Sequence, residues 1–279
     1  MRPLLKWAGG KQWLSPTLVA ALSPGERLIE PFAGGGSFFF RAEPKTAILG
    51  DTNALLMTTY RVVAAQPIAV AKALQKWQPD RETYNSVRAF QPDSEVGVAA
   101  RFIYLNHTSY GGMWRVNRAG VFNVPFSGRT SAWLPGETEL SEVATLLRRA
   151  ALRPNDFRGT LNEARPGDVV YCDPPYAGSG TEVVFNRYSE LPFTDHDHHD
   201  LACALQALVK RGIRVMLSVD SRCPGLERYL DIGLVAYEHG YRQGLGYKDR
   251  ARETRQEYLL FTEHAALAAH LQSRNWSRV

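Results

Sequence analysis

A short stretch after an apolar run combines a carboxylate, two prolines and an aromatic ring: Asp173, Pro174, Pro175 and Tyr176. The apolar run, residues 169–172, reads as a buried strand, and the prolines must end it because they lack an N–H and restrict the preceding residue. The turn then carries two acceptors, the Asp173 carboxylate and the Pro174 carbonyl. An amino group conjugated to a ring is a poor nucleophile, and two acceptors that hold its hydrogens favour a more nucleophilic nitrogen while Tyr176 stacks on the ring. We therefore predict that this turn binds such an amine.

A glycine-rich turn lies earlier in the chain, where the sequence PFAGGG spans residues 31–36 between a predicted strand and a predicted helix. Glycines such as Gly34 and Gly36 let a ligand approach the backbone. Asp51 ends the next strand, 17 residues after Gly34, where a carboxylate can accept both hydroxyls of a ribose. The spacing is not G-x-G-x-x-G and no Gly-Lys-Ser/Thr follows. The pattern predicts a nucleoside cofactor without a pyrophosphate.

The sequence KWAGGK, residues 6–11, places Trp7 and Lys11 around two glycines before any regular element. One interpretation is an arm that packs Trp7 for stability. The other is that Trp7 and Lys11 close over a bound small molecule, because a lysine beside aromatic surface suits a ligand with a carboxylate.

The composition is that of a globular protein, with 279 residues of which 44% are apolar and 22% are charged. No apolar run reaches the roughly 18 residues of a membrane span, and the first residues lack the continuous apolar region of a signal peptide. The three cysteines are odd in number and far apart, which argues against a disulfide framework and against a zinc site. We expect a cytoplasmic protein with no membrane partner.

Charge is unevenly distributed along this chain, whose formal net charge is +5. No acidic residue occurs between Glu95 and Glu137, a stretch that is rich in arginine and aromatic residues. Such a stretch suits a polyanion that also offers stacking surfaces, as nucleic acids do. The residues concerned are Arg101, Arg115, Arg118, Arg129, Tyr104, Tyr110, Trp114 and Trp133.

Strand and helix patterns alternate at both ends of the chain and predict an α/β core. Between them, residues 58–148 read as helices with breaks near Pro67, Pro79 and Pro92, followed by a hairpin at about residues 113–126 in which Gly120 takes a positive φ. We expect one domain from residues 1–57 and 149–279, with residues 58–148 inserted into it.

The sequence DHDHHD, residues 195–200, has two interpretations. Its histidines and acids could ligate a metal, but the spacing lacks the i, i+4 pattern of a zinc protease. We interpret it as a solvated helix start, with Thr194 as the N-cap and acids that suit the helix dipole. We expect no bound metal.

Taken together, KWAGGK, PFAGGG, Asp51-Thr52-Asn53 and Asp-Pro-Pro-Tyr after a long insert resemble the Dam family of DNA adenine methyltransferases. The order of these motifs resembles the alpha group of amino-methyltransferases, the D12 class, and RVNRAGVFNVPF looks like the family's recognition hairpin. The likeness runs over nearly the whole chain up to about residue 262.

This resemblance implies a Rossmann-like methyltransferase core, a mixed sheet with helices on both faces and an inserted target-recognition domain. It implies S-adenosylmethionine as the methyl donor, S-adenosylhomocysteine as the product, and double-stranded DNA as the substrate, methylated at N6 of a flipped adenine. Catalytic residues would be Asp173, Pro174, Pro175 and Tyr176. The cofactor would contact Trp7, Lys11, Phe32, Ala33, Gly34, Gly36, Asp51 and Asp173.

The resemblance also implies DNA contacts at Tyr110, Met113, Arg115, Arg118, Asn123 and Arg129. Tyr110 matches an aromatic residue that helps to expel or replace the flipped base, and Met113 and Arg115 match base-reading positions. At Gly111 this sequence departs from the family members that methylate GATC, which carry a polar side chain there. GATC is the leading candidate for the recognition site, and a cognate restriction endonuclease is a candidate partner.

Two alternatives stay open at this point. The first is an amino-methyltransferase that acts on cytosine N4 or on RNA, since close versions of Asp-Pro-Pro-Tyr serve such enzymes. The second is a DNA-binding regulator on a catalytically silent core.

Arg115 offers a test of base reading, because arginine can bind guanine O6 and N7 with two hydrogen bonds. Arg115→Ala should blur the choice of sequence more than it weakens nonspecific binding, which methylation assays on matched and altered duplexes would measure. An equal loss on every duplex would instead make Arg115 a phosphate contact.

Overall fold

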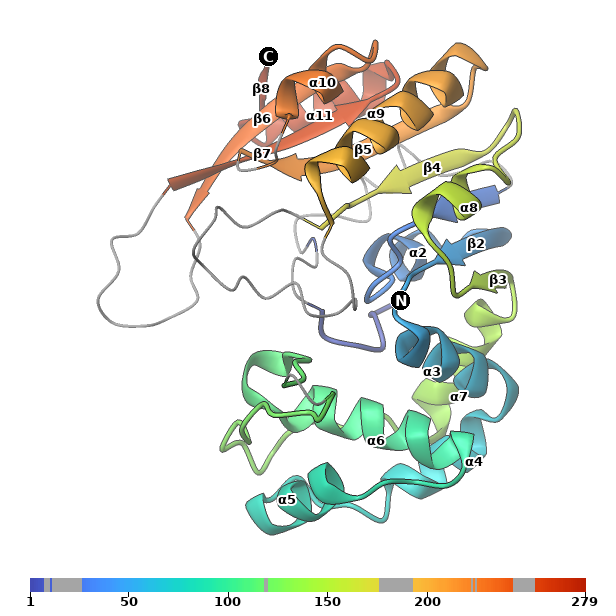
Figure 1. The fold of residues 1–279 in the computed structure, drawn as a ribbon, viewed down its shortest axis with the longest axis vertical. Coiled ribbons are helices and arrows are strands. Elements are labelled where there is room, and N and C mark those ends of the chain that lie inside the picture. The colour runs from blue at the N-terminus through green and yellow to red at the C-terminus, as the bar shows by residue number, and fades with distance from the viewer. Residues whose placement is uncertain are drawn as a thin grey trace.

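The described strands form one sheet in the order β3-β2-β1-β4-β5-β7-β6-β8, which fills the upper half of the molecule (Figure 1). The computed structural model describes residues 1–7, 11, 27–117, 120–175, 193–221, 223, 225–242 and 254–279. β1 to β5 run parallel, and β7 is antiparallel to both β5 and β6. The strands are β1 (Arg27–Glu30), β2 (Thr46–Gly50), β3 (Ala150–Arg153), β4 (Val169–Cys172), β5 (Arg214–Asp220), β6 (Val235–Arg242), β7 (Thr254–Phe261) and β8 (Ser277–Arg278).

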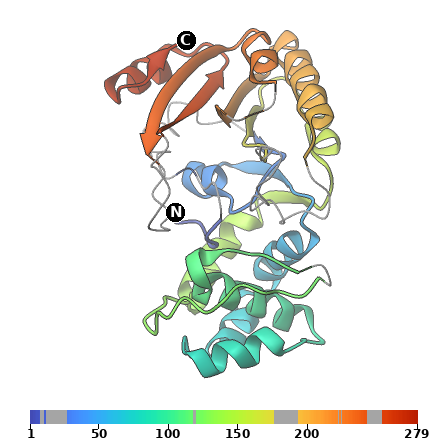
Figure 2. The same cartoon turned by 60° about the vertical axis from the view of Figure 1, so that its left-hand side comes forward.

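Helices cover both faces of this sheet, because successive side chains of a strand point to opposite sides. In β4, Val169 and Tyr171 join one hydrophobic cluster with α2 and α11, while Val170 and Cys172 join another with α8, α9 and α10. Figure 2 shows α9 and α11 on opposite sides of the sheet. The mixed α/β sheet that the sequence predicted is confirmed. These helices are α2 (Ser37–Ala42), α8 (Phe157–Leu161), α9 (Asp195–Lys210), α10 (Leu226–Leu230) and α11 (Ala265–Ser273).

A second group of helices connects β2 to β3 and fills the lower half of the molecule (Figure 1). Asn53 starts the group, since its side chain accepts the Leu56 N–H at 3.0 Å as an N-cap. Pro67 is the first residue of α4, as a proline at a helix start should be. The elements are α3 (Ala54–Ala65), α4 (Pro67–Leu74), α5 (Arg81–Ala89), α6 (Glu95–Thr108), the 3₁₀ helix η1 (Tyr110–Gly112) and α7 (Glu137–Leu147).

The buried side chains of this helical group belong to the same hydrophobic cluster as the α2 face of the sheet. The two halves of the molecule are therefore packed on each other through continuous apolar contacts. Within the described ranges, no single helix has both the length and the apolarity to cross a membrane; α3 and α4 meet the test only as a pair bent by 110°.

The region predicted as a hairpin pairs through two isolated antiparallel bridges, Ser109 with Phe126 and Val116 with Phe122, rather than through continuous strands. Backbone bonds between Asn123 N–H and Arg115 C=O, at 3.1 Å, hold the two segments together. Gly120 has φ +74°, as expected at the turn. In the described part of these segments buried and exposed side chains alternate: Trp114, Phe122 and Val124 are buried, whereas Arg115, Val121 and Asn123 are exposed.

Gly50 lies where β2 meets α8, and any side chain there would meet Thr160. A Cβ at Gly50 would lie 2.1 Å from Thr160 Oγ1. Gly50→Ala should therefore lower the free energy of unfolding by about 1–3 kcal/mol, as overpacking does, in urea titrations. In a Thr160→Ala background the same change should cost less, and purely additive effects would contradict this account.

Candidate active site

The order of the strands reverses between β1 and β4, because the chain runs from β1 to β2 and β3 on one side and from β4 to β5 on the other. Open α/β sheets bind ligands beside the carboxyl ends of the strands at such a point. The turn at Gly34 follows β1 here and Asp173 follows β4. Two motifs that are far apart in sequence therefore follow neighbouring strands at the reversal point.

Lys11 joins this position through two ion pairs. Its Nζ lies 3.0 Å from Asp173 Oδ1 and 3.1 Å from Glu257 Oε1. The lysine side chain is only 7% exposed and that of Asp173 is 21% exposed. Lys11 and Asp173 were both predicted around one ligand, and the structure brings them into contact. Tyr176 lies outside the described residues.

Further acids share this edge of the sheet, and sequence reasoning missed them. Alternation along β1, β5 and β7 puts Glu30, Asp220 and Glu257 on the face that bears α2, the same side as Tyr171. Glu257 is paired with Asp220 in the β5–β7 register. The Ser218 hydroxyl donates to Glu257 Oε1 at 3.1 Å. Each acid continues an alternating strand pattern at the same edge of the sheet as Asp173, and this pattern is the signal that could have found them.

Glu30 is buried, with only 2% of its surface exposed. Its pKa is raised to about 8, mainly by burial and also by the negative charge of Asp173, while a bond from the Phe39 N–H acts in the opposite direction. Its Oε1 has no hydrogen-bond partner within the described part of the chain. A buried carboxyl oxygen without a partner is a place where a ligand can donate.

Asp51 is tied to the glycine turn. Its Oδ2 accepts the Gly34 N–H at 2.9 Å and its Oδ1 accepts the Asn53 N–H at 2.8 Å. Burial raises the pKa of Asp51, while these two N–H bonds act in the opposite direction. The Tyr60 hydroxyl donates to Gly34 C=O at 2.7 Å and fixes the other side of the turn. Each carboxylate oxygen can accept a further bond, so Asp51 keeps capacity for a ligand's hydroxyls.

Trp7 lies directly on the glycine turn. A Cβ at Gly34, which has φ +45°, would be 2.7 Å from Trp7 Nε1, and a Cβ at Gly35 would be 2.8 Å from Trp7 Cβ. The glycines were predicted to let a ligand approach the backbone. In this structure the Trp7 side chain packs against them, and a contact of Trp7 with a ligand stays a prediction.

Phe32 and Ala33 complete the wall of the turn. The Ala33 N–H donates to Gly50 C=O at 2.8 Å. The Phe32 ring stacks on Phe157 with centroids 5.4 Å apart and meets Phe193 edge-on at 5.6 Å. The turn is thus continuous with an aromatic cluster that reaches α8.

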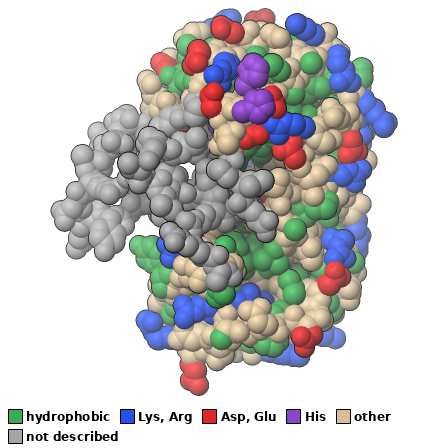
Figure 3. All heavy atoms as spheres, in the orientation of Figure 1, with side chains coloured by type: hydrophobic (Ala, Val, Ile, Leu, Met, Phe, Trp, Pro, Cys, Tyr) green, Lys and Arg blue, Asp and Glu red, His purple; other side chains and the backbone are tan. Residues whose placement is uncertain are grey.

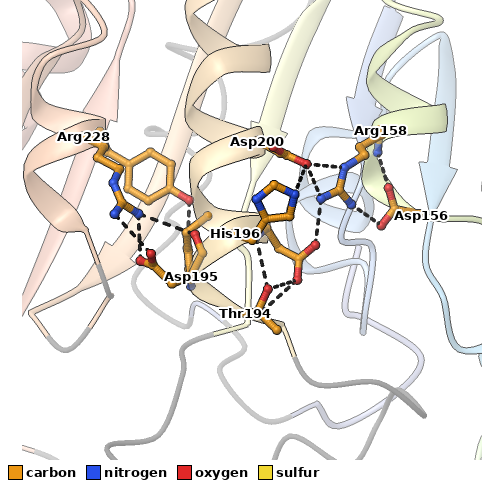
Figure 4. A network of polar contacts seen from close by, with 10 residues as sticks. Asp156, Arg158, Thr194, Asp195, His196, Asp200 and Arg228 are labelled. Carbon is orange, nitrogen blue, oxygen red and sulfur yellow. Dashed lines mark hydrogen bonds and ion pairs between the residues drawn. The ribbon is translucent and has the colours of Figure 1, made fainter.

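Arg158 on α8 forms ion pairs with acidic residues in the first turns of α9 (Figure 4). Its guanidinium bonds Asp197 Oδ1 at 2.7 Å and Asp200 Oδ2 at 2.6 Å, and it lies over the Phe157 ring at 4.3 Å. Thr194 caps α9 by accepting the Asp197 N–H, which confirms the predicted helix start.

The acids of DHDHHD therefore have arginine partners, and Asp195 pairs with Arg228 at 2.7 Å. Figure 3 shows histidine and acidic side chains gathered over this part of the surface. The described ranges contain no group of three or more histidine, cysteine or acidic side chains arranged to hold a metal ion.

Of the residues predicted to contact DNA, four are exposed in the described part of the chain: Tyr110, Arg115, Asn123 and Arg129. Tyr110 is 52% exposed, and the exposed Arg115 donates through Nε to Asn123 Oδ1 at 2.8 Å. Met113 is half-buried and Arg129 is exposed, while Arg118 lies outside the described residues. Sequence reasoning missed two cations beside this set. The pKa of Lys6 is lowered by burial and by the charges of Arg129 and Arg2, so the N-terminal arm adds to the basic surface.

The raised pKa of Glu30 predicts a dependence of stability on pH. From its ordinary value of 4.5 to about 8, the folded protein holds a proton that the unfolded chain has lost, so stability falls as pH rises through this interval. Glu30→Gln should unfold at a similar urea concentration to the parent near pH 4.5. At pH 7 the variant should be the more stable by up to about 3 kcal/mol. Glu142→Gln, at an exposed carboxylate, is the control, and a constant difference across pH would contradict the prediction.

Comparison with known proteins assigns the chain to a family. The model for D12 class N6 adenine-specific DNA methyltransferases matches residues 7–242. The chain is 34% identical to the DNA adenine methylase of Escherichia coli (strain K12) over 223 residues, 78% of this chain and 80% of that protein. It is 34% identical to the DNA adenine methylase of Serratia marcescens over 91% of this chain and 92% of that protein. It is 30% identical to a Type II methyltransferase of Lactococcus lactis subsp. cremoris over 91% and 93% of the two chains. The predicted family is confirmed, and the chain belongs to the D12 class of N6 adenine-specific DNA methyltransferases.

Proposed function

We propose that this enzyme transfers a methyl group from S-adenosylmethionine to N6 of a flipped adenine in a short duplex site, with GATC as the leading candidate. The observation that carries the proposal is the contact between Lys11 and Asp173 at the reversal point of the sheet, beside the glycine turn.

The charge of this edge supports a cationic donor. The Asp173 and Glu257 carboxylates both contact the ammonium of Lys11, and Asp220 is the register neighbour of Glu257. Carboxylates in a poorly solvated place favour a positively charged ligand. The unpartnered Oε1 of Glu30 also fits a ligand that donates a hydrogen bond. When bound, S-adenosylmethionine supplies an electrophilic methyl group on a sulfonium.

Each predicted cofactor residue has a role in this proposal. Asp51, held rigid by Gly34 and Asn53, takes the ribose hydroxyls. Lys11 lies toward the carboxylate of the methionine portion. The wall consists of Trp7, Phe32, Ala33, Gly34 and Gly36.

For the methyl-accepting amine, we propose that the Asp173 carboxylate and the Pro174 carbonyl take the two N6 hydrogens, with Pro175 stiffening the turn and Tyr176 stacking on the base. Positive charge develops on nitrogen as it attacks, and Asp173 stabilises it electrostatically. The ammonium of Lys11, 3.0 Å away, keeps Asp173 ionised and fixes its orientation. Holding both reactants in line would supply much of the rate.

We propose that residues 58–148 form the target-recognition domain and that residues 1–57 and 149–279 form the catalytic domain. Tyr110 would help to expel the adenine, at a cost of a few kcal/mol in lost stacking. Arg115, held by Asn123, and Met113 would read bases. Arg118 and Arg129 would contact phosphates, and Arg2 and Lys6 lie beside Arg129 in the same basic surface. The enzyme would act in the cytoplasm, where a cognate restriction endonuclease is a partner to search for.

Replacing Asp173 tests the proposal. Asp173→Ala should lower methyl transfer from labelled S-adenosylmethionine to duplex DNA by about 10³-fold or more, because it removes an acceptor and a charge. Digestion of the product to nucleosides should yield N6-methyladenine, and mapping in cellular DNA identifies the site.

The matched control is Asp168→Asn, which breaks a similarly buried ion pair with Arg27 (2.7 Å) at the opposite edge of the sheet. It should lower stability and leave the methylation of adenine in place. Full activity of a folded Asp173→Ala enzyme would show that this residue has no part in the mechanism. Methylcytosine in the digest would show that the enzyme methylates cytosine and not adenine.

A further inference from the structure

We infer that Asn106 is a positioning residue that couples the recognition turn at Tyr110–Gly112 to the arm that carries Trp7, and so couples DNA binding to cofactor binding. This inference rests on the proposed function and adds a route between its two ligands. Asn106 belongs to none of the motifs discussed above, and it is fully buried near the end of α6.

One side-chain amide makes three backbone contacts here. Asn106 Oδ1 accepts the Lys6 N–H at 2.9 Å, and Nδ2 donates to Lys6 C=O at 2.7 Å and to Gly112 C=O at 3.1 Å. Asparagine has an acceptor and two donors in one planar group, so it can satisfy both polar groups of one residue and one group of another. The arm and the recognition turn are thereby held by the same rigid group.

We call the contacts of Asn106 with Lys6 and Gly112 the junction. Neighbouring residues make further close contacts around it. His107 Nε2 lies 2.8 Å from Leu4 C=O, and Lys6 Nζ donates to His107 C=O at 3.0 Å. A Cβ at Gly112, which has φ +66°, would be 2.7 Å from Lys6 Cβ. The turn and Lys6 are thus in direct contact, and neither can shift without the other or without breaking buried hydrogen bonds.

On one side the junction leads to the proposed cofactor site, and on the other side it leads to the proposed DNA contact. Trp7 follows Lys6 and rests on Gly34 and Gly35, at the turn proposed for the cofactor. Tyr110 precedes Gly112 by two residues, is half exposed and is proposed to meet DNA. A duplex that orders the turn would order the arm through Asn106, and the cofactor would do the reverse, since coupling between two sites is reciprocal.

The strength of the coupling is measurable as a ratio of dissociation constants. Leaving a buried backbone group unpaired is unfavourable, so a state in which only one partner of Asn106 has moved is poorly populated. We expect a duplex with the mapped methylation site to tighten the binding of S-adenosylhomocysteine by about tenfold, within the usual range for such coupling.

The experiment measures the dissociation constant of S-adenosylhomocysteine by calorimetry with and without that duplex. Asn106→Leu keeps the approximate size of the side chain and removes all three hydrogen bonds, and it should bring the tenfold ratio close to one. Gly112→Ala, which displaces Lys6 from the other side, should do the same. Thr108→Val is the matched control, because Thr108 is fully buried on the same helix and its hydroxyl donates to Tyr104 C=O at 2.6 Å. It should lower thermal stability and keep the parent ratio.

Hydrogen exchange of the unmodified protein gives a second measurement that needs no variant to fold. S-adenosylhomocysteine should slow exchange at residues 109–113, and the duplex should slow exchange at residues 4–7. Three results would overturn the inference. The first is a ratio of dissociation constants of one in the parent protein, and the second is an unchanged ratio in both Asn106→Leu and Gly112→Ala. The third is hydrogen exchange that slows only beside each ligand. Each of these results is compatible with methylation of adenine, whereas a parent protein that methylates no DNA contradicts the proposed function itself.

Discussion

A buried ammonium group that touches two carboxylates organises the carboxyl edge of the sheet. Lys11 Nζ lies 3.0 Å from Asp173 and 3.1 Å from Glu257, and the three side chains come from the N-terminal arm, the end of β4 and β7. Moving a charge out of water costs several kcal/mol, so a lysine this buried requires close counter-charges. The contact exists only because β5 lies between β4 and β7 and brings both acids to one edge. The contacts of Lys11 therefore depend on the order of the strands β4, β5 and β7 in the sheet.

The same arm is held a second time on the helical half of the molecule. Asn106 binds both backbone groups of Lys6, and Trp7 lies between this junction and Lys11, on glycines that leave no room for a side chain of their own. Among the described residues of this arm, Lys6 is thus held at the helical half and Lys11 at the edge of the sheet. In the proposed function, this arm forms a wall of the cofactor site.

Local patterns were sufficient for much of the fold. Apolar runs predicted β1, β2 and β4, and side-chain capping predicted the start of α9 at Thr194. β3 was missed because its four residues are all half-buried and show no alternation. The role of Glu257 was missed for a different reason. Its partners depend on the antiparallel register between β5 and β7, and no local pattern states which strands will be neighbours. The predicted roles of Tyr176 and Arg118 concern residues outside those described.

An ion-paired carboxylate is a weaker acceptor than one without a counter-ion, so the contact with Lys11 raises a question about the proposed binding of an amine by Asp173. Glu257 supplies the answer. Because the ammonium has a second carboxylate 3.1 Å away, its charge stays balanced when Asp173 turns toward another donor. Glu257 and Asp220, which are neighbours in the β5–β7 register, add further carboxylates at this edge, so positive charge that develops on a nitrogen there is stabilised by several groups at once. A lysine shared between two acids therefore keeps Asp173 ionised and lets it exchange partners with less loss of electrostatic energy than a one-to-one pair would allow.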